Sequence, residues 1–281
     1  MEICKTIAQT RAYLHRARLN GLTVGLVPTM GYLHEGHLSL MRECKKKCDV
    51  VVVSIFVNPL QFGPTEDFAQ YPRDLERDAR LAETVGADLI FCPEPSEMYL
   101  SNHSTFVEVE NLTDKMCGKS RPGHFRGVAT VVTKLFNIVR PDYAFFGQKD
   151  AQQALVIQKM VEDLNMGIEI ITVPIVREGD GLAKSSRNVY LSPEERRAAP
   201  VLWRSLQAAK AAVKEGERDV MKIQNIVRDT ISAEPLAQID YIEILSIPDL
   251  NELTYLNTPV LLALAVRFGK TRLIDNIILE A

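Results

Sequence analysis

The chain has 281 residues, of which 46% are hydrophobic and 25% charged, and this is the composition of an ordinary globular protein. Its formal net charge of −3 provides no basic field for a nucleic-acid backbone, so small molecules are the expected partners. The apolar run at residues 50–57 is far shorter than the ~20 residues that cross a bilayer, and the amino terminus lacks the apolar core of a signal peptide. The five cysteines contain no C-x-x-C pair. We therefore expect a cytoplasmic protein with reduced thiols.

Short β-branched runs alternate with helical patterns through the first 176 residues. The expected strands are residues 23–27, 49–57, 87–93, 142–147 and 168–176, and the expected helices are residues 36–48, 73–85, 124–139 and 151–165. The strands are apolar almost throughout, which is typical of strands that are buried on both faces of a sheet. The pattern therefore predicts an α/β domain built on a parallel sheet with helices on both faces.

The pattern changes after Arg177. Ser192 has the features of a helix N-cap, with Pro193 in the first turn and Glu195 at the third position, so we expect one long helix from there to about Gly216. A second helix is expected at residues 219–233, followed by antiparallel strands within residues 238–247, 259–268 and 271–279. We therefore expect two domains, residues 1–177 and 178–281, of which the second is a smaller α+β domain.

Two histidines, His34 and His37, follow the first expected strand in the segment TMGYLHEGHLSL, residues 29–40. At the carboxyl end of a parallel strand, the start of a helix presents N–H groups to an anion, which favours phosphate contact for both histidines. Gly31 and Gly36 would let the backbone approach such a ligand. Two alternatives stay open: polar side chains that only begin a helix, and a metal site, although the zinc pattern H-E-x-x-H needs histidines four apart.

Two other nucleotide-binding signatures are incomplete. CGKS at residues 117–120 and FGKT at residues 268–271 resemble the end of a P-loop, but Thr113 and Leu264 stand where that loop needs a glycine. The sequence also contains no G-x-G-x-x-G segment. Neither a P-loop kinase nor a dinucleotide dehydrogenase is therefore indicated.

Three further segments carry groups that suit an anionic substrate, and each also has a purely structural explanation. FFGQKDAQQ, residues 145–153, could place Lys149 on a phosphate and Gln153 on a polar substrate, or could simply initiate a helix. LAKSSRN, residues 182–188, could grip a triphosphate with two charges and two hydroxyls, or could be a solvated linker. GKSRPGHFRG, residues 118–127, could cover anionic ligands or could be only a basic loop.

Four segments, taken in order, resemble the pantothenate synthetase (pantoate:β-alanine ligase) family over essentially the whole chain: PTMGYLHEGHLSL, VSIFVNPLQFGPTEDFAQYPR, GHFRGVATVVTKLFNIVRPDYAFFGQKDAQQ and DGLAKSSRN. H-x-G-H alone would indicate only the wider nucleotidyltransferase superfamily. The resemblance implies a Rossmann-like amino-terminal domain, a homodimer and a requirement for Mg²⁺. It also implies that ATP, pantoate and β-alanine react through a pantoyl adenylate to give pantothenate, AMP and pyrophosphate.

The same resemblance implies roles for individual residues. His34 and His37 would contact the ATP phosphates, with His37 usually cast as the proton donor, and Lys149 would act with them in catalysis. Gln61 would bind pantoate and β-alanine, and Gln153 would bind pantoate. The implied ATP-binding residues are Met30, Gly31, Tyr32, Leu33, His34, Glu35, Gly36, His37, Gly147, Gln148, Lys149, Asp150, Val176, Lys184, Ser185, Ser186 and Arg187.

Three residues depart from the family pattern: Lys184 stands where methionine is common, Gly179 where proline is common, and Val189 where glycine is common. We expect Lys184 to contact the β- or γ-phosphate. The sequence does not identify the Mg²⁺ ligands; Asp78 and the phosphates themselves are the groups considered. The alternative functions are another nucleotidyltransferase, which would need a cationic pocket for a phosphorylated substrate, and a non-catalytic nucleotide-binding module.

Overall fold

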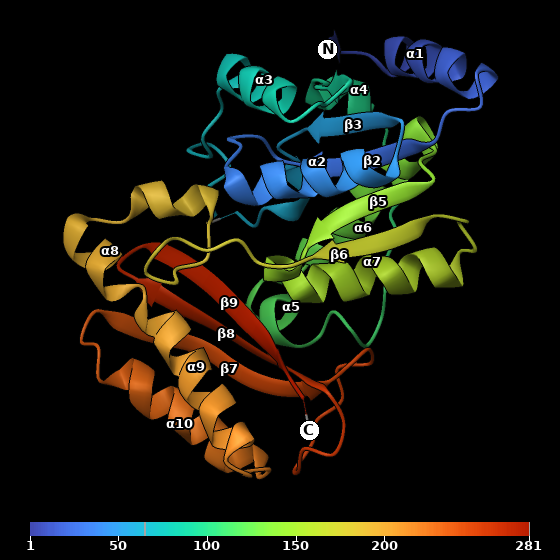
Figure 1. The fold of residues 1–281 in the computed structure, drawn as a ribbon. Coiled ribbons are helices and arrows are strands. Elements are labelled where there is room, and N and C mark those ends of the chain that lie inside the picture. Colours follow the sequence, from blue (N-terminus) through green and yellow to red (C-terminus); the bar gives the residue numbers. More distant parts are fainter. Residues whose placement is uncertain (65, 281) are drawn as a thin grey trace. The chain divides into compact units, whose positions relative to one another are not determined.

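The computed structural model describes residues 1–64 and 66–280, and the chain divides into two compact units (Figure 1). Unit 1 consists of Met1–Glu110, Arg121–Gln148 and Gln153–Pro174, and unit 2 consists of Asn111–Ser120, Lys149–Gln152 and Ile175–Ala281. Segments of the two units alternate along the chain, whereas the sequence predicted two continuous domains that meet at residue 177. Within the described residues, no helix has both the length and the apolar character needed to cross a bilayer.

Unit 1 is built on a six-stranded sheet whose strands all run parallel. The strands are β1 (Glu2–Cys4), β2 (Val24–Thr29), β3 (Val50–Ile55), β4 (Leu89–Phe91), β5 (Tyr143–Gly147) and β6 (Glu169–Val173). Their order across the sheet is β1-β4-β3-β2-β5-β6. The chain moves from β2 to β3 in one direction and from β5 to β6 in the other, so the strand order reverses between β2 and β5. In open α/β sheets, ligands bind beyond the carboxyl ends of the strands at such a point.

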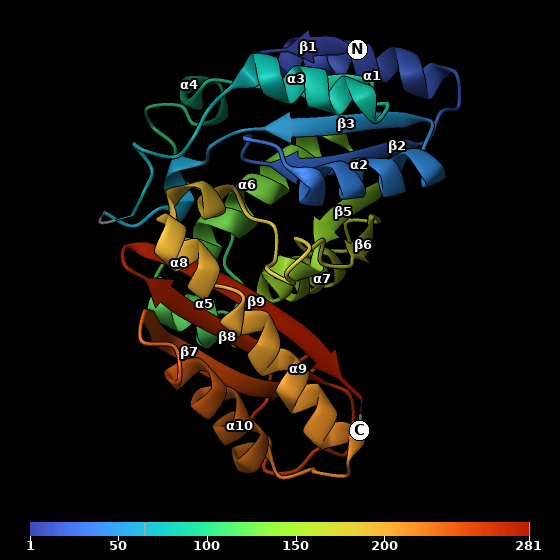
Figure 2. The ribbon, with the colours of Figure 1, turned by 60° about the vertical axis from the view of Figure 1, so that its left-hand side comes forward.

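Helices cover both faces of this sheet. They are α1 (Ile7–Leu19), α2 (Glu35–Lys47), α3 (Leu75–Thr84), α4 (Pro95–Met98), α6 (His124–Val139) and α7 (Ala151–Asp163), with short 3₁₀ helices η1 (Pro59–Gln61) and η2 (Gln148–Asp150). α2 and α3 pack together on one face (Figure 2). α1 packs against α6 on the other face, as right-handed crossovers require. α7 contacts α6 through Met160 and Thr133. The predicted Rossmann-like α/β class is therefore confirmed.

The core of unit 1 includes two thiols that pack directly against the sheet. A Cβ at Gly25 of β2 would lie 2.2 Å from Cys44 Sγ and 2.7 Å from Cys48 Sγ, both of which come from α2 or its end. Burial raises the pKa of both thiols, which keeps them protonated and unreactive. Packing is therefore the role of this pair, and all five cysteines of the chain are free.

Two elements at the amino terminus, β1 and α1, were not predicted from the sequence. β1 is a short strand at the edge of the sheet. α1 buries only a narrow stripe made of Thr10, Leu14 and Ala17, so its apolar period is weak. Its start does carry a sequence signal, because Thr6 and Gln9 form a capping box.

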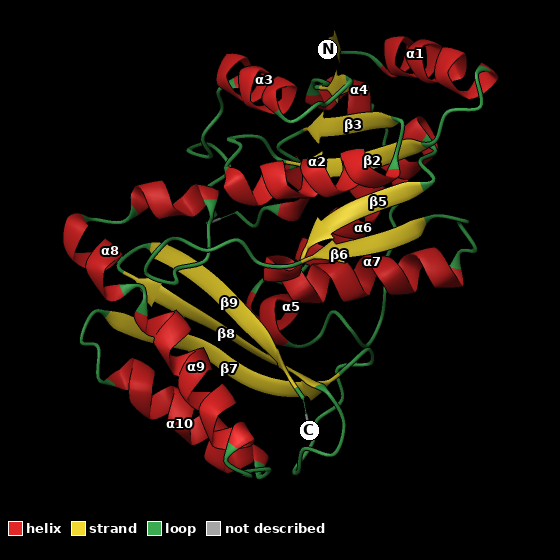
Figure 3. Cartoon of the chain, viewed as in Figure 1, coloured by secondary structure: helices red, strands yellow, loops and turns green. Residues whose placement is uncertain are grey.

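Unit 2 contains a three-stranded antiparallel sheet with helices packed on it (Figure 3). The strands are β7 (Ala237–Ser246), β8 (Val260–Phe268) and β9 (Thr271–Leu279), and the helices are α5 (Met116–Ser120), α8 (Pro193–Ala198), η3 (Ser186–Tyr190), α9 (Val201–Lys214) and α10 (Val220–Ser232). α9 and α10 lie side by side on one face of the sheet, where Ile242 and Ile244 of β7 join their core. Tyr241 and Glu243 alternate with these residues and contact α5 instead. The predicted α+β class of this part is confirmed.

The single long helix expected from Ser192 is two helices, α8 and α9. Its start is as predicted, because Ser192 Oγ accepts from the Glu195 N–H (3.2 Å) and Glu195 Oε2 accepts from the Ser192 N–H (2.8 Å). The break between the two helices includes Pro200. Proline has no N–H to donate within a helix and its ring clashes with the preceding turn, so the prediction of one continuous helix was wrong at this point.

Candidate active site

The segment after β2 forms a tight turn before α2 begins. The Thr29 hydroxyl donates to the Ser54 carbonyl (2.8 Å) and accepts from the Gly31 N–H (3.1 Å). Gly31 has a φ of +82° and Tyr32 a φ of +49°, which is a backbone region that favours glycine. The turn places the start of α2 beyond the carboxyl end of β2, where the strand order reverses.

Asp78 of α3 fixes this turn in place. Its two carboxylate oxygens accept from the N–H groups of Tyr32 and Leu33 (2.7 Å each), and Arg77 donates to the Leu33 carbonyl (3.0 Å). Asp78 is 1% exposed, and burial raises its pKa against the lowering effect of the two amide hydrogen bonds. Because both carboxylate oxygens bind the backbone, Asp78 acts as a positioning residue for the turn.

His34 and His37 are built into the start of α2. The Gly36 N–H donates to His34 Nδ1 (3.1 Å), and the His34 N–H donates to His37 Nδ1 (3.3 Å). The two rings stack with their centroids 4.0 Å apart. Because each Nδ1 accepts a hydrogen bond, the proton of each neutral ring is assigned to Nε2. Both rings therefore carry a donor on Nε2, as contact with a phosphate oxygen requires.

The residues between the two histidines serve the helix itself. A Cβ at Gly36 would lie 2.9 Å from two atoms of the His34 ring, so glycine is needed here for His34 to cap α2. Glu35 forms an ion pair with Arg42 on the same helix. The local packing thus gives Gly36 and Glu35 structural roles whether or not they also contact a nucleotide.

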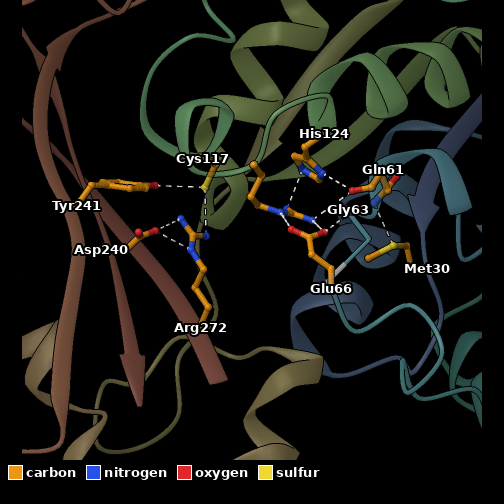
Figure 4. Close-up of polar contacts among 10 residues, drawn as sticks. Met30, Gln61, Gly63, Glu66, Cys117, His124, Asp240, Tyr241 and Arg272 are labelled. Atoms are coloured by element: carbon orange, nitrogen blue, oxygen red, sulfur yellow. Dashed lines mark hydrogen bonds and ion pairs between the residues drawn. The ribbon is translucent and has the colours of Figure 1, made fainter. Parts of the chain in front are cut away.

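Gln61 lies in η1, after β3, and is 9% exposed. Its Oε1 accepts from Asn58 Nδ2 (3.2 Å), and its Nε2 donates to Met30 Sδ (3.1 Å; Figure 4). Asn58 is held in turn, because it accepts from the Tyr99 hydroxyl (2.8 Å) and donates to the Gly127 carbonyl (3.1 Å). Since Asn58 uses the amide oxygen and Met30 takes one N–H, Gln61 is oriented to offer its second N–H to a substrate. The Met30 contact brings Gln61 together with the turn after β2.

Protein groups bind the basic residues at the start of α6. Arg121 forms an ion pair with Glu66 (2.5 Å), and His124 Nδ1 lies 2.8 Å from the Gln61 carbonyl oxygen. The sequence left two interpretations of segment 118–127 open: a cover for anionic ligands and a basic loop. In the structure, Arg121 and His124 of this segment support Gln61.

The chain leaves β5 through Gly147 and η2. Among the described residues, a Cβ at Gly147 would meet no atom within 4 Å, so packing does not require a glycine here and leaves room for a ligand. The Lys149 ammonium lies 3.6 Å from the Asp150 carboxylate, and the Asn276 amide donates to the Lys149 carbonyl (3.0 Å). Gly147 and Gln148 belong to unit 1, whereas Lys149 and Asp150 belong to unit 2.

The remaining candidate ATP-binding residues form one local structure in unit 2. The Lys184 N–H donates to the Val176 carbonyl (3.0 Å), and Ser185 caps η3 by accepting from the Arg187 N–H (3.2 Å). The segment is thus a hydrogen-bonded turn rather than a solvated linker. Lys184 Nζ lies 3.0 Å from Glu178 Oε2, so a phosphate would have to compete with Glu178 for this ammonium.

Two neighbouring residues of β9 brace these segments. Asp275, which is 1% exposed, accepts two hydrogen bonds from Arg177 (2.6 and 2.9 Å), and the Arg177 guanidinium lies 3.8 Å from the centre of the Trp203 ring. Burial raises the pKa of Asp275, in opposition to the bonds from Arg177. Asn276, the next residue, holds Lys149. Neither residue was predicted from the sequence, because their partners lie 98 and 127 positions away.

The family of the chain follows from comparison with known proteins. A family model described as pantoate-beta-alanine ligase matches residues 2–278. The chain belongs to this ligase family. The pantothenate synthetase of Pelotomaculum thermopropionicum is 66% identical over 279 residues, which cover 99% of this chain and 99% of that protein. The pantothenate synthetase of Heliobacterium modesticaldum is 59% identical over 280 residues, which cover 100% of both chains.

Two solved structures extend the similarity of this ligase to its fold. The pantothenate synthetase of Thermus thermophilus is 47% identical, has a TM-score of 0.94 and shares 99% of each chain. The pantoate-beta-alanine ligase of Francisella tularensis, complexed with beta-gamma ATP and beta-alanine, is 33% identical, has a TM-score of 0.82, and the match covers 99% of this chain and 97% of that one. These findings confirm the resemblance inferred from the sequence motifs.

For this ligase, sequence motifs found the candidate binding residues but not the residues that hold them. Asn58 had a usable signal, because Asn58-Pro59 has the pattern of an N-cap followed by a first-turn proline, and Asn58 does cap η1. Asp78 was considered only as a Mg²⁺ ligand, because a carboxylate in the first turn of α3 gives no signal for contact with a distant backbone. The role of Asp78 depends on the backbone of Tyr32 and Leu33.

Proposed function

We propose that this ligase condenses pantoate with β-alanine in an ATP-dependent reaction that forms pantothenate and releases AMP and pyrophosphate. The observation that carries the proposal is the arrangement of His34 and His37, each with an Nε2–H donor, at the point where the strand order reverses. The Francisella tularensis relative, complexed with beta-gamma ATP and beta-alanine, supports a nucleotide and an amine as substrates.

The first step activates the pantoate carboxylate. A carboxylate oxygen attacks the α-phosphorus of ATP, the bond from that phosphorus to the bridging oxygen breaks, and pyrophosphate leaves with the electron pair. The product is pantoyl adenylate, a mixed anhydride with a good leaving group. Negative charge develops on the phosphates, so this step depends on positioned donors and cations more than on a strong acid or base.

The second step forms the amide. The β-alanine amine attacks the activated carbonyl carbon, the bond from that carbon to the phosphate oxygen breaks, AMP leaves and the nitrogen loses a proton. An amine held against the adenylate can gain on the order of 7–11 kcal/mol from proximity alone. Water must be excluded during this step, because it would hydrolyse the adenylate.

The two glutamines are assigned to the organic substrates in this proposal. Gln61 would bind pantoate and also lie near β-alanine, and Gln153 would bind pantoate. The orientation of Gln61 supports its role, because Asn58 takes the amide oxygen and Met30 takes one N–H, which leaves the second N–H for a carboxylate or hydroxyl. A neutral amide can hold the carboxylate without the strong ion pair that would weaken it as a nucleophile.

The nucleotide is assigned to the segments 30–37, 147–150 and 184–187, with Val176 holding the adenine by its backbone. Lys149 would act with the histidines on the phosphates, and Lys184 would contact the β- or γ-phosphate after leaving Glu178. Mg²⁺ would neutralise phosphate charge. Among the described residues, no group of three or more acidic, histidine or cysteine side chains could hold a metal ion, so Mg²⁺ would take its ligands mainly from phosphate and water.

The proposed setting is the cytoplasm, where ATP is available, and the proposed assembly is a homodimer, as the family resemblance implies. The five free cysteines agree with a reducing compartment. Localisation of the tagged protein and its mass in solution would test these two points.

A single assay tests the reaction. The protein is incubated with ATP, Mg²⁺, pantoate and β-alanine, each substrate is omitted in turn, and AMP, pyrophosphate and ADP are measured. We expect AMP and pyrophosphate that depend on both organic substrates. ADP would indicate a different phosphoryl transfer, and nucleotide binding without turnover would indicate a binding module.

Isotope transfer tests the adenylate intermediate. Pantoate labelled with ¹⁸O in its carboxylate should transfer one labelled oxygen to AMP, because that oxygen bridges carbon and phosphorus in the adenylate. Unlabelled AMP formed together with pantothenate would contradict the intermediate.

A further inference from the structure

A largely buried ion pair lies beside Gln61 in unit 1. Arg121 Nε and Nη2 donate to the two carboxylate oxygens of Glu66 (2.5 and 2.7 Å), and the side chains are 16% and 24% exposed. The Gly63 N–H donates to the same carboxylate (3.1 Å; Figure 4). Burial alone would raise the pKa of Glu66, but the hydrogen bonds and charge of Arg121 outweigh it and lower this pKa to about 2. Glu66 is therefore ionised at neutral pH and fixes the orientation of the guanidinium.

The same guanidinium sets the tautomer of His124. Arg121 Nη1 lies 3.0 Å from His124 Nε2, and His124 Nδ1 lies 2.8 Å from the Gln61 carbonyl oxygen. A guanidinium can only donate and a carbonyl can only accept. Both contacts are hydrogen bonds only when the ring is neutral and its proton lies on Nδ1. Arg121 thus selects the tautomer that donates to Gln61.

Gln61 is held at both ends by neighbouring groups. Its carbonyl accepts from His124 Nδ1 and also from Arg121 Nη2 (3.3 Å), and its Oε1 accepts from Asn58 (3.2 Å). Its own helix, η1, has only three residues and provides little rigidity. The position of the Gln61 amide therefore depends on contacts from outside η1.

We propose that Glu66, Arg121 and His124 form a positioning relay for Gln61. Glu66 orients Arg121, Arg121 sets the tautomer of His124, and His124 holds the Gln61 carbonyl. The three side chains act through Gln61, so this inference rests on the proposed function in which Gln61 binds pantoate. The relay sets the affinity for pantoate and not the affinity for ATP.

The first test removes the charge of Glu66 and keeps its shape. In Glu66→Gln, we expect the KM for pantoate to rise by about tenfold to a hundredfold, which is the loss typical of hydrogen bonds to a charged group. The KM for ATP should stay within about twofold, because Gln61 contacts the ATP-assigned segment through Met30 Sδ, and a thioether sulfur accepts only a weak hydrogen bond. Thermal unfolding establishes that each variant is folded before its kinetics are compared.

A double-mutant cycle tests whether the residues act as one relay. Arg121→Gln should raise the KM for pantoate like Glu66→Gln, and the double variant should raise it no further than the larger single effect. Arg121→Lys keeps the charge but lacks the planar fork that reaches three partners, so it should show the same selective rise and provides a test if Glu66→Gln does not fold. Arg126→Gln is the matched control, because Arg126 lies over the Phe106 ring (4.0 Å) outside the relay and should leave the KM unchanged.

The outcomes separate the relay from the proposed function. If the wild-type protein forms no pantothenate, the proposed function is wrong. If it does, the relay is overturned by an unchanged KM for pantoate in the variants, by a parallel rise in the KM for ATP, or by additive effects in the double variant. A selective and non-additive rise supports it.

Discussion

Each imidazole of the H-x-G-H segment has one nitrogen bound to the backbone at the start of α2. His37 Nδ1 accepts from the His34 N–H, so a neutral His37 has its only proton on Nε2. Giving up that proton would leave an anionic ring, which is unfavourable at neutral pH. We therefore expect His37 to stabilise charge on the phosphates by hydrogen bonding rather than to transfer its proton.

Two substitutions of His37 test this role. His37→Ala should lower kcat by roughly 10²- to 10³-fold, which is the usual loss for one donor to a transition state. His37→Gln can place an N–H near the position of Nε2 but is not an acid, so it should recover part of the lost kcat. Steady-state kinetics with saturating substrates measure both values. A glutamine variant no better than alanine would argue for proton transfer.

Two further side chains hold the candidate residues in position. Asn58 orients the Gln61 amide, and Asp78 holds the turn before His34. The position of His34 after a buried strand and the family resemblance of the Gln61 segment predicted these two candidates. The contact of Asn58 with the Gln61 side chain and the contacts of Asp78 with the backbone before His34 were not predicted, because both depend on the folded geometry.

At the scale of elements, the close approach of α6 to η1 depends on Gly127. A Cβ there would lie 2.3 Å from the Leu60 carbonyl oxygen and 2.6 Å from the Gln61 nitrogen, so the backbone of η1 would have to move. Gly127→Ala should lower the free energy of unfolding by about 1–3 kcal/mol, as overpacking does, and raise the KM for pantoate. Denaturant unfolding and steady-state kinetics measure the two effects.

Gly147→Ala, at the end of β5, is the counterpart of Gly127→Ala at a glycine that packing does not require. A Cβ there would meet no described atom within 4 Å, so the free energy of unfolding should change by less than about 0.5 kcal/mol. If the backbone at Gly147 approaches ATP, the added methyl should raise the KM for ATP while the KM for pantoate stays unchanged. A stable variant with an unchanged KM for ATP would remove Gly147 from the ATP site.

The prediction of helix ends depends on how local the sequence signal is. Ser192 and Glu195 predicted the start of α8 correctly, because a capping box involves only neighbouring residues. The break at Pro200 also had a local signal, which the long apolar pattern around it outweighed. α1 was missed for the opposite reason, since its buried stripe is too narrow to stand out.

At the scale of the whole molecule, two adjacent glutamines at the start of α7 belong to different units. Gln152 is 5% exposed and lies in unit 2, where it donates to the carbonyls of Leu112 and Lys115 (2.8 Å each) and accepts from the Cys117 N–H (3.0 Å). Gln153 lies in unit 1 and is assigned to pantoate in the proposed function. One residue therefore ties segment 111–120 into unit 2, while its neighbour is a candidate for substrate binding.

Substitution of the two glutamines should separate stability from binding. Gln152→Ala leaves three backbone groups without their partner and should lower the free energy of unfolding by about 3 kcal/mol. Gln153→Ala should change it by less than about 0.5 kcal/mol and raise the KM for pantoate. Denaturant unfolding of both variants, with kinetics of the second, measures these effects. Equal destabilisation by the two changes would contradict the division of roles.

The sequence by itself determined the fold class, the family and the candidate residues. Alternating apolar runs predict buried parallel strands, the position and spacing of His34 and His37 favour phosphate contact, and the family resemblance implies the role of Gln61. Only the tertiary structure decided which distant residues support them: His124 lies 63 positions from Gln61, and Asp78 lies 45 positions from Leu33 in the turn before His34. Glu66 and Arg121 are 55 positions apart and Asp275 and Arg177 are 98 apart, and no local pattern specifies which carboxylate a folded chain brings to which guanidinium.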